Sequence, residues 1–364
     1  HVYPASHEHG NDILAGLQSR PVSAAAIFTH DPRLSSLTLR DALFLDTETT
    51  GLAGAGTLAF MVGLAFWEGD ALIVRQTFCR DYDDEPAMLW LVAQQAATKA
   101  AVVSFNGRSF DLPLLNGRYL LNRLDDVGDA LFSLPHLDLL PPSRRLWRSR
   151  LISCSLHSLE EKLLGVTRGE IEVPGWAIPA IYHDYLHDGD GREIARVFYH
   201  NRMDMLSMVT LIGRLLRQFE QPQAWDDPLD LLSLAKWQVE LEMLDEAEQV
   251  LRQVANPQHP LGPYQEALTW LGQLYKHSGR RTEAIQCWQQ IAVTSLDNVS
   301  AHVELAKHYE WREVDLGRAL EWTDRALRLL DHRHPVSPGS PAASQRAELE
   351  HRLARLRKKA SGGD

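Results

Sequence analysis

The sequence predicts an α/β domain followed by an all-α region, and three observations lead to this fold class. Residues 41–78 hold three β-rich runs in succession, and residues 85–140 then alternate helical and β-rich segments. This order is typical of a mixed sheet with helices on both faces. After residue 222 the sequence contains only helical patterns, and these recur with a period near 35 residues.

The α/β domain, predicted for residues 40–220, is expected to contain a five-stranded mixed sheet. The strands are predicted at residues 43–45, 57–66, 71–78, 101–105 and 136–140, with a Glu-Gly-Asp turn joining the second and third. Helices are predicted at residues 85–98, 111–121 and 193–219. The preceding residues, 1–39, show little periodicity, and we expect an extended arm with one short helix near 12–18.

The charge and the hydropathy of the chain restrict its partners. The formal net charge is −11, and a uniformly acidic surface repels phosphate, so contact with a nucleic acid requires a local basic patch and bound metal. The longest apolar run, residues 58–67, is too short to span a bilayer, and no signal peptide is visible. We therefore expect no membrane partner.

The cysteines favour a reducing, cytoplasmic setting. Cys79, Cys154 and Cys287 lie far apart and form no C-x-x-C pair, so neither a zinc site nor a disulfide framework is expected. Because the chain begins at His1 rather than at a methionine, we expect that its natural N-terminus has been lost.

Two carboxylates at the end of a buried strand indicate a metal site. Asp46 and Glu48 follow the apolar run 43–45 and precede the turn residues 49–51. Side chains two apart on a strand point to the same face, so these carboxylates would lie side by side. Two such charges destabilise each other unless a cation lies between them, and Mg²⁺ or Mn²⁺ takes oxygen ligands. A solvated turn is the alternative.

Two other segments provide further candidates for this site. Asp111 follows a buried strand and an Asn-Gly turn at the start of a predicted helix, where a lone Asp is often only an N-cap. His200 and Asp204 lie four residues apart on the helix 193–219, so their side chains share one face. An exposed ion pair without a chemical role is the alternative for these two.

Three motifs together resemble those of the DnaQ-like, four-acid (DEDD) 3′–5′ exonucleases of the ribonuclease H-like superfamily. They are DTETTG at 46–51, SFNGRSFDLPLL at 104–115 and HNRMDML at 200–206. Within this superfamily the sequence is most similar to the YprB-type branch, which includes the bacterial mitomycin repair factor B family. The resemblance covers about residues 41–218 and the helical tail. It implies a ribonuclease H-like sheet, a DNA substrate and a role in DNA repair beside a helicase.

The resemblance also implies the catalytic set. Two divalent metal ions, Mg²⁺ or Mn²⁺, would be bound by Asp46, Glu48, Asp111 and Asp204, with Asp46 bridging both. The third motif of the family usually has a histidine five residues before the acid or a tyrosine four before it. Here the pairing is reversed, because Tyr199 lies five residues before Asp204 and His200 lies four residues before it. The YprB-type pattern HNxxD and a pKa near neutrality favour His200 as the general base, with Tyr199 in reserve.

A basic stretch is the candidate for contact with the substrate. Residues 143–150, SRRLWRSR, place four arginines around one tryptophan. Phosphate contacts and base stacking use such residues, but a helix whose tryptophan anchors the core has the same pattern. With the positions that the family's motifs imply, the candidates for nucleic-acid contact are Thr50, Leu52, Asn106, Phe110, Arg144, Arg145, Trp147 and Arg148. We expect Asp138 to cap the end of its strand.

The C-terminal third shows an internal repeat over residues 228–330. Ala247, Ala284 and Ala319 lie 37 and 35 residues apart, which is close to the helix-turn-helix period of tetratricopeptide repeats. Stacked helix pairs form a concave surface, so either partner binding, by a DNA-repair helicase, or support of the nuclease is expected. Residues 331–364 are interpreted as a linker and a basic helix at 345–359 that either caps the array or contacts phosphate.

The sequence thus predicts a metal-dependent 3′–5′ exonuclease that hydrolyses DNA. Two alternatives stay open. One is an RNA-trimming exonuclease, because no feature of the sequence indicates whether a 2′-hydroxyl is recognised. The other is a catalytically inactive ribonuclease H-like scaffold with a repeat that binds a partner, against which the full set of four acids and His200 argues.

Overall fold

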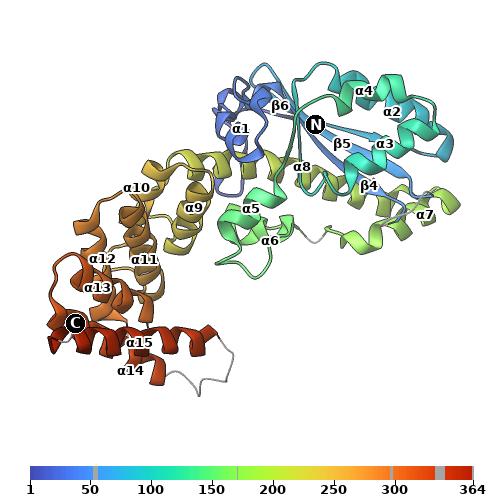
Figure 1. The fold of residues 1–364 in the computed structure, drawn as a ribbon. Coiled ribbons are helices and arrows are strands. Elements are labelled where there is room, and N and C mark those ends of the chain that lie inside the picture. Colours follow the sequence, from blue (N-terminus) through green and yellow to red (C-terminus); the bar gives the residue numbers. More distant parts are fainter. Residues whose placement is uncertain (52–55, 170, 296–297, 333–340, 363–364) are drawn as a thin grey trace. The chain divides into compact units, whose positions relative to one another are not determined.

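The structure, a computed structural model, describes residues 1–51, 56–169, 171–295, 298–332 and 341–362 (Figure 1). The chain divides into two compact units, residues 1–223 and 224–364. The first unit contains the sheet, and the second is helical throughout its described residues.

The sheet of the first unit is mixed, as predicted. Its described strands are ordered β1-β6-β5-β4-β7-β8. They span Val2–Tyr3 (β1), Ala42–Thr49 (β4), Ala59–Glu68 (β5), Ala71–Phe78 (β6), Ala101–Ser104 (β7) and His136–Asp138 (β8). The strands β4, β5 and β6 form an antiparallel meander, whereas β7 and β8 continue the sheet in parallel beyond β4. The buried strand β4 is therefore internal to the sheet.

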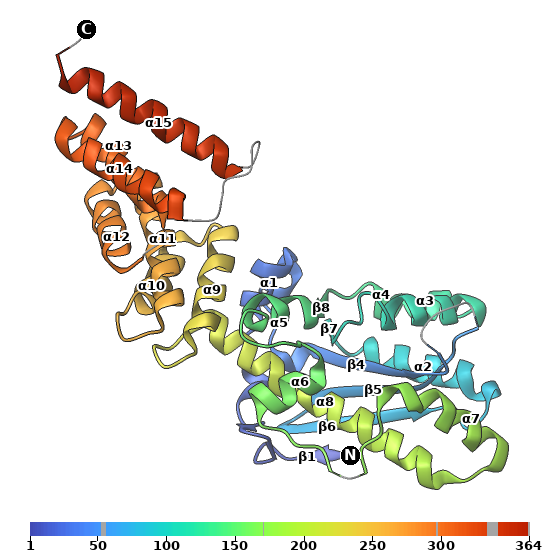
Figure 2. The same ribbon diagram turned by 90° about the horizontal axis from the view of Figure 1, so that it is seen from below.

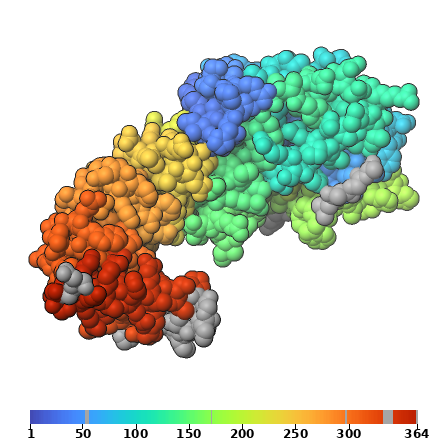
Figure 3. Space-filling view, in the orientation of Figure 1, coloured from blue at the N-terminus to red at the C-terminus, as the bar shows by residue number. Residues whose placement is uncertain are grey.

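The prediction of five strands was wrong, because the residues predicted as an N-terminal arm provide a sixth. Strand β1 pairs with β6 and adds a sixth strand, because its backbone groups satisfy those of an otherwise open edge. The arm also contains a second small sheet of β2 (Glu8–His9) and β3 (Asp12–Ile13), and a helix α1 (Ser23–Thr29). Figure 3 shows part of this N-terminal segment, in blue, on the surface of the first unit.

The short helix predicted near residues 12–18 forms only as one 3-10 turn at Leu17–Ser19, and this has a local reason. Strand β3 occupies the start of that range, and Gly16 adopts a left-handed backbone with φ of 79°. A left-handed residue ends a helix rather than continuing it. The helix forms later, at α1, where two buried alanines, Ala24 and Ala25, pack inward.

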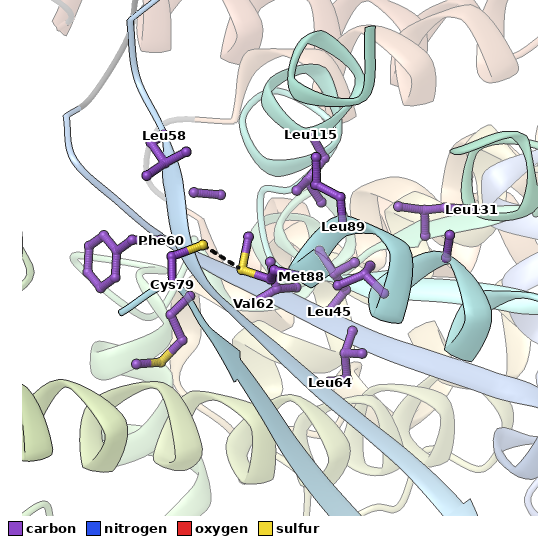
Figure 4. Close-up of a cluster of buried hydrophobic side chains, with 14 of the residues drawn as sticks. Leu45, Leu58, Phe60, Val62, Leu64, Cys79, Met88, Leu89, Leu115 and Leu131 are labelled. Atoms are coloured by element: carbon purple, nitrogen blue, oxygen red, sulfur yellow. Dashed lines mark hydrogen bonds between the residues drawn. The ribbon is translucent and has the colours of Figure 1, made fainter. Parts of the chain in front are cut away.

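Helices cover both faces of the sheet (Figures 1 and 2). One face carries α2 (Glu85–Ala96), α3 (Asp111–Leu121) and α4 (Asp125–Phe132), and the other carries α7 (Ile178–Asp188) and α8 (Gly191–Glu220). Between the two layers of helices, β4 and β5 are almost entirely buried, since both of their faces meet apolar side chains. In Figure 4, Leu45 and Val62 of these strands lie beside Met88 and Leu89 of α2.

The second unit consists of helices that pack in consecutive pairs. They are α9 (Pro228–Glu240), α10 (Leu244–Val254), α11 (Leu261–His277), α12 (Arg281–Thr294), α13 (Val299–Trp311), α14 (Leu316–His332) and α15 (Pro341–Ala360). The three alanines of the repeat are fully buried, one on the second helix of each pair. The predicted all-α region is confirmed, and the tetratricopeptide assignment stays a prediction.

The last helix, α15, is held to the array by its basic residues. The buried carboxylate of Glu310 on α13 accepts hydrogen bonds from Arg352 at 2.7 Å and from Arg355 at 2.7 Å, and Lys359 lies at 3.3 Å. Of the two roles expected for this helix, these contacts correspond to capping. Over the described residues, no helix is long and apolar enough to cross a membrane.

Candidate metal centre

The four predicted acids and His200 come together around the end of β4. Asp46 and Glu48 belong to this strand, Asp111 is the first residue of α3, and α8 carries His200 and Asp204. Ligand atoms of Glu48, His200 and Asp204 all lie within 4.8 Å of one another. Asp46 and Asp204 line the same cavity. Residues that are more than 150 positions apart in the sequence therefore face one another.

A glycine opposite Asp46 makes room for the side chain that holds it. Gly63 of β5 pairs with Asp46, and a Cβ atom at Gly63 would lie 2.3 Å from Oδ1 of Asn201. The fully buried amide of Asn201 fills this space, donates to Oδ2 of Asp46 at 2.9 Å, and accepts from Gln76 at 2.9 Å. Asn201 thus orients Asp46 without adding charge. Asn201 lies within the HNRMDML motif, but its sequence position predicted no role for it.

Asp111 occupies the position beside β4 where the pairing with β7 has ended. The last paired residues of β4 and β7 are Phe44 and Val103, so the backbone N–H of Thr47 is available and donates to Oδ1 of Asp111 at 3.1 Å. The Thr47 hydroxyl donates to the same oxygen. The N-cap of α3 is Phe110, so the Asp111 carboxylate does not serve as the cap that the alternative proposed.

Burial and mutual repulsion raise the pKa values of three of the acids. Burial raises the pKa of Asp111 to about 6, although the hydrogen bonds from Thr47 oppose this. The pKa of Asp46 is raised well above its usual value by burial and by the nearby carboxylates of Asp111 and Asp204. For Glu48, burial and the Asp46 charge act in the same direction. The site therefore resists carrying all of its negative charge by itself.

The residues present fit a divalent cation. Among the described residues, Oε1 of Glu48 is buried without a hydrogen-bond partner, although a buried polar atom normally has one. A cation bound there would supply the missing partner and relieve the repulsion. Carboxylate oxygens are ligands that Mg²⁺ and Mn²⁺ accept. Asp46, Glu48, Asp111 and Asp204 are the residues that would hold such ions.

A buried cation, Arg168, contacts one of the acids and was not predicted from the sequence. The Arg168 side chain is 4% exposed and forms an ion pair with Asp204. It also donates to Glu160 at 2.6 and 2.8 Å and to Glu172 at 2.9 Å. Arg168 and Glu172 lie in an irregular segment between α6 (Leu156–Leu159) and α7, without periodicity or a known motif. No pattern in the sequence pointed to them.

The two candidates for the general base have different surroundings. Nε2 of His200 lies 3.4 Å from Oδ2 of Asp204, and Nδ1 contacts Glu172. Burial lowers the pKa of His200, but Glu172 and Asp204 outweigh burial, and the pKa is raised overall. The hydroxyl of Tyr199 instead accepts from the backbone N–H of Gly169 at 3.2 Å. His200 is thus the candidate that contacts an acid of the site.

A cavity of about 560 Å³ opens beside these acids. Asp46 and Asp204 line it together with Asn106, Arg144 and Arg148, all three of which were candidates for nucleic-acid contact. Arg144 belongs to α5 (Leu140–Trp147), and Arg148 follows one turn later, so both side chains lie on one side of this helix. The cavity therefore combines carboxylates suited to metal with cations suited to phosphate.

The prediction that Trp147 contacts nucleic acid is wrong. Its side chain is fully buried, and its indole N–H donates to Oε1 of Gln218 at 3.0 Å, so its ring is not exposed for base stacking. The alternative considered for this pattern, a tryptophan that anchors the helix to the core, is the one observed. On this short helix Leu146 and Trp147 are buried, whereas Arg144 is exposed.

Three of the remaining candidates do not line this cavity. Of the described candidates, Thr50, Phe110 and Arg145 do not line it, and Thr50 instead exchanges hydrogen bonds with the backbone of Leu58. Leu52 lies outside the described residues. Asp138 caps the end of β8, as expected, because its carboxylate accepts from the backbone N–H groups of Asn106, Arg108 and Leu140.

Comparison with known proteins agrees with this architecture. Residues 43–216 match the RNase_H_2 family model, whose description is RNase_H superfamily. The chain is 28% identical over 368 residues to the uncharacterized protein YprB of Bacillus subtilis (strain 168), an alignment that covers 99% of this chain and 85% of the relative. Residues 43–216 therefore match a ribonuclease H superfamily domain, and an all-α region follows them.

The buried charges predict how stability depends on pH. Because the pKa values of Asp46, Glu48 and Asp111 are raised in the folded chain, that chain binds more protons than the unfolded chain above about pH 4. The free energy of unfolding should therefore fall as the pH rises through the window between the two sets of pKa values. In EDTA at pH 8, we expect Glu48→Gln to raise the melting temperature, and we expect Mg²⁺ to stabilise the parent more than this variant.

Thermal unfolding at several pH values, with EDTA or Mg²⁺, measures both effects. Asp184→Asn on α7 is the matched control because its side chain is 79% exposed, and it should leave the melting temperature unchanged. The assignment would be contradicted by a parent whose stability in EDTA does not fall as the pH rises. It would also be contradicted if Mg²⁺ raised the melting temperature of Glu48→Gln as much as that of the parent.

Proposed function

We propose that this protein is a metal-dependent 3′–5′ exonuclease that hydrolyses phosphodiester bonds of DNA. The observation that carries the proposal is the cavity in which Asp46 and Asp204 lie with Arg144 and Arg148. Carboxylates of this kind hold divalent ions, and arginines contact phosphate. A nuclease that cleaves phosphodiesters needs both in one place, and the ribonuclease H superfamily domain supports this reading.

The chemistry divides among the residues of the site. Divalent ions held by the four carboxylates would offset the charge of the scissile phosphate and activate the attacking water. His200 would accept a proton from this water at Nε2, the ring nitrogen that lies on the Asp204 side. Asn201 keeps Asp46 in place through an uncharged hydrogen bond, and Thr47 does the same for Asp111.

The arginines bind the substrate against an unfavourable net charge. With a net charge of −11, the chain as a whole repels a polyanion. Arg144 and Arg148 provide local positive charge beside the acids, and they would neutralise phosphates next to the scissile bond. The choice of DNA, the 3′ to 5′ direction, the repair role and a helicase partner for the helical unit rest on the resemblance to the YprB-type exonucleases.

One observation favours a second candidate, an inactive ribonuclease H-like scaffold. Arg168 forms an ion pair with Asp204 and so neutralises one of the acids without a metal ion. An enzyme that has lost its metal would use such a replacement. Against this, Oε1 of Glu48 lacks any partner within the described part of the chain, and Arg168 does not reach it.

An exonuclease assay separates these candidates. We expect purified protein to shorten 5′-labelled DNA from its 3′ end with Mn²⁺ or Mg²⁺ but not with EDTA. Asp46→Asn should lower kcat by more than about 100-fold, because it removes charge from the metal site. Asp184→Asn serves again as the control and should keep full activity. Degradation of RNA but not DNA would favour the trimming enzyme, and inactivity on both would favour the scaffold.

The arginines of the cavity predict a change in binding and in its salt dependence. Arg144→Glu and Arg148→Glu should each raise KM and reduce the slope of log K against log salt concentration by about 0.7 to 0.9. Arg145→Glu is the matched control, because it is exposed on the same helix but does not line the cavity. Steady-state kinetics at four salt concentrations measure the effect. An equal rise in KM and an equal change in slope for Arg145→Glu would mean that the cavity does not bind phosphate.

A further inference from the structure

A buried cluster of charged side chains lies directly behind His200 and Asp204. Arg168 is its centre, with Glu160, Glu172 and Asp204 as acceptors of its guanidinium. A guanidinium is a rigid plane of donors and accepts no hydrogen bond. Each of its contacts therefore fixes the direction of a carboxylate. We call Arg168, Glu160 and Glu172 the Arg168 cluster.

The Arg168 cluster is anchored to α8 and to the N-terminal residues. Glu160 is fully buried, and its Oε1 accepts from the hydroxyl of Ser207 on α8 at 2.5 Å. Ser207 in turn lies 2.8 Å from Nε2 of His9 on strand β2. The N-terminal residues thus reach the site through a chain of buried hydrogen bonds. Such a chain leaves Arg168 little freedom to move.

Glu172 connects this anchor to the imidazole of His200. Its Oε1 contacts Nδ1 of His200 and also accepts from Nη1 of Arg168 at 2.9 Å. The Arg168 Nη1 and the His200 Nδ1 are 3.2 Å apart, and two donors lie this close because they share one carboxylate oxygen. Since a carboxylate only accepts, Nδ1 carries the proton. The lone pair of the neutral ring is then on Nε2, which lies 3.4 Å from Asp204.

We propose that Glu172 is a positioning residue that fixes the tautomer and the orientation of His200, with Arg168 holding Glu172 in place. This inference rests on the proposed exonuclease function, in which His200 accepts a proton at Nε2. A histidine whose far nitrogen is held by a carboxylate presents one defined nitrogen to the reaction. Without Glu172 the ring could rotate or change its tautomer, and Nε2 would then no longer direct a lone pair at the water.

The test is a series of variants at Glu172 in the full chain. Glu172→Ala removes the acceptor, whereas Glu172→Gln keeps an oxygen that accepts from Nδ1. We expect Glu172→Ala to lower kcat about 10-fold to 100-fold with little change in KM, and Glu172→Gln to recover most of the loss. Glu161→Ala is the matched control, because this acid is exposed next to Glu160 in the sequence and pairs with the surface residues His157 and Lys162.

A second measurement reads the tautomer without depending on activity. Nitrogen NMR of the ¹⁵N-histidine-labelled chain in Mg²⁺ distinguishes a protonated from an unprotonated ring nitrogen, and His200→Asn identifies the His200 signals among the 16 histidines. We expect protonated Nδ1 and unprotonated Nε2 in the parent and in Glu172→Gln. Glu172→Ala should populate the other tautomer. Unchanged melting temperatures would show that the variants fold.

The outcomes separate this inference from the proposed function. An active parent whose Glu172→Ala variant keeps both its kcat and its His200 tautomer would overturn the inference alone. A changed tautomer with unchanged kcat would also overturn it, because the orientation of His200 would then not matter to the reaction. A parent that is inactive on every substrate would overturn the proposed function, and the catalytic part of this inference with it.

Discussion

The repulsion among buried carboxylates at the end of β4 is the constraint that organises the first unit. Each acid meets this constraint with a different partner. Asp46 has the amide of Asn201, Asp111 has the hydroxyl and backbone of Thr47, and Asp204 has the guanidinium of Arg168. Oε1 of Glu48 is buried without a hydrogen-bond partner among the described residues. Protein groups thus hold three of the four acids in place. The charge of the fourth, Glu48, would be balanced by a bound cation.

The fold supplies the positions that this arrangement needs. Strand β4 is internal to the sheet, and the shorter β7 ends before it, which leaves room for Asp111 at the start of α3. Helix α8 packs against β4, β5 and β6, and Gly63 lets Asn201 of this helix approach the sheet closely. Even the N-terminal residues contribute, since His9 supports the far end of the Arg168 cluster. The site therefore depends on elements from most of the first unit.

The acids of the site could be predicted from the sequence, but the residues that hold them could not, and this difference has a physical cause. Asp46 and Glu48 follow a strand whose apolar pattern is unambiguous, and Asp204 lies on a strongly periodic helix, so their local structure was predictable. Arg168 and Glu172 lie in an irregular segment, where no periodicity relates sequence to position. Their roles come from contacts over 28 to 36 residues of chain, which only the folded structure reveals. The prediction that Trp147 contacts nucleic acid was wrong for a different reason. Which side of a short basic helix is buried depends on the elements that pack against it. The two-residue strand β1 was too short to leave a pattern.

The central claim is that these carboxylates bind divalent metal, and anomalous diffraction from crystals grown with Mn²⁺ tests it most directly. The account predicts Mn²⁺ within about 2.5 Å of carboxylate oxygens of Glu48 and Asp204, with Asp46 also coordinated. Strong anomalous peaks elsewhere on the protein, with none at these acids at millimolar Mn²⁺, would contradict it.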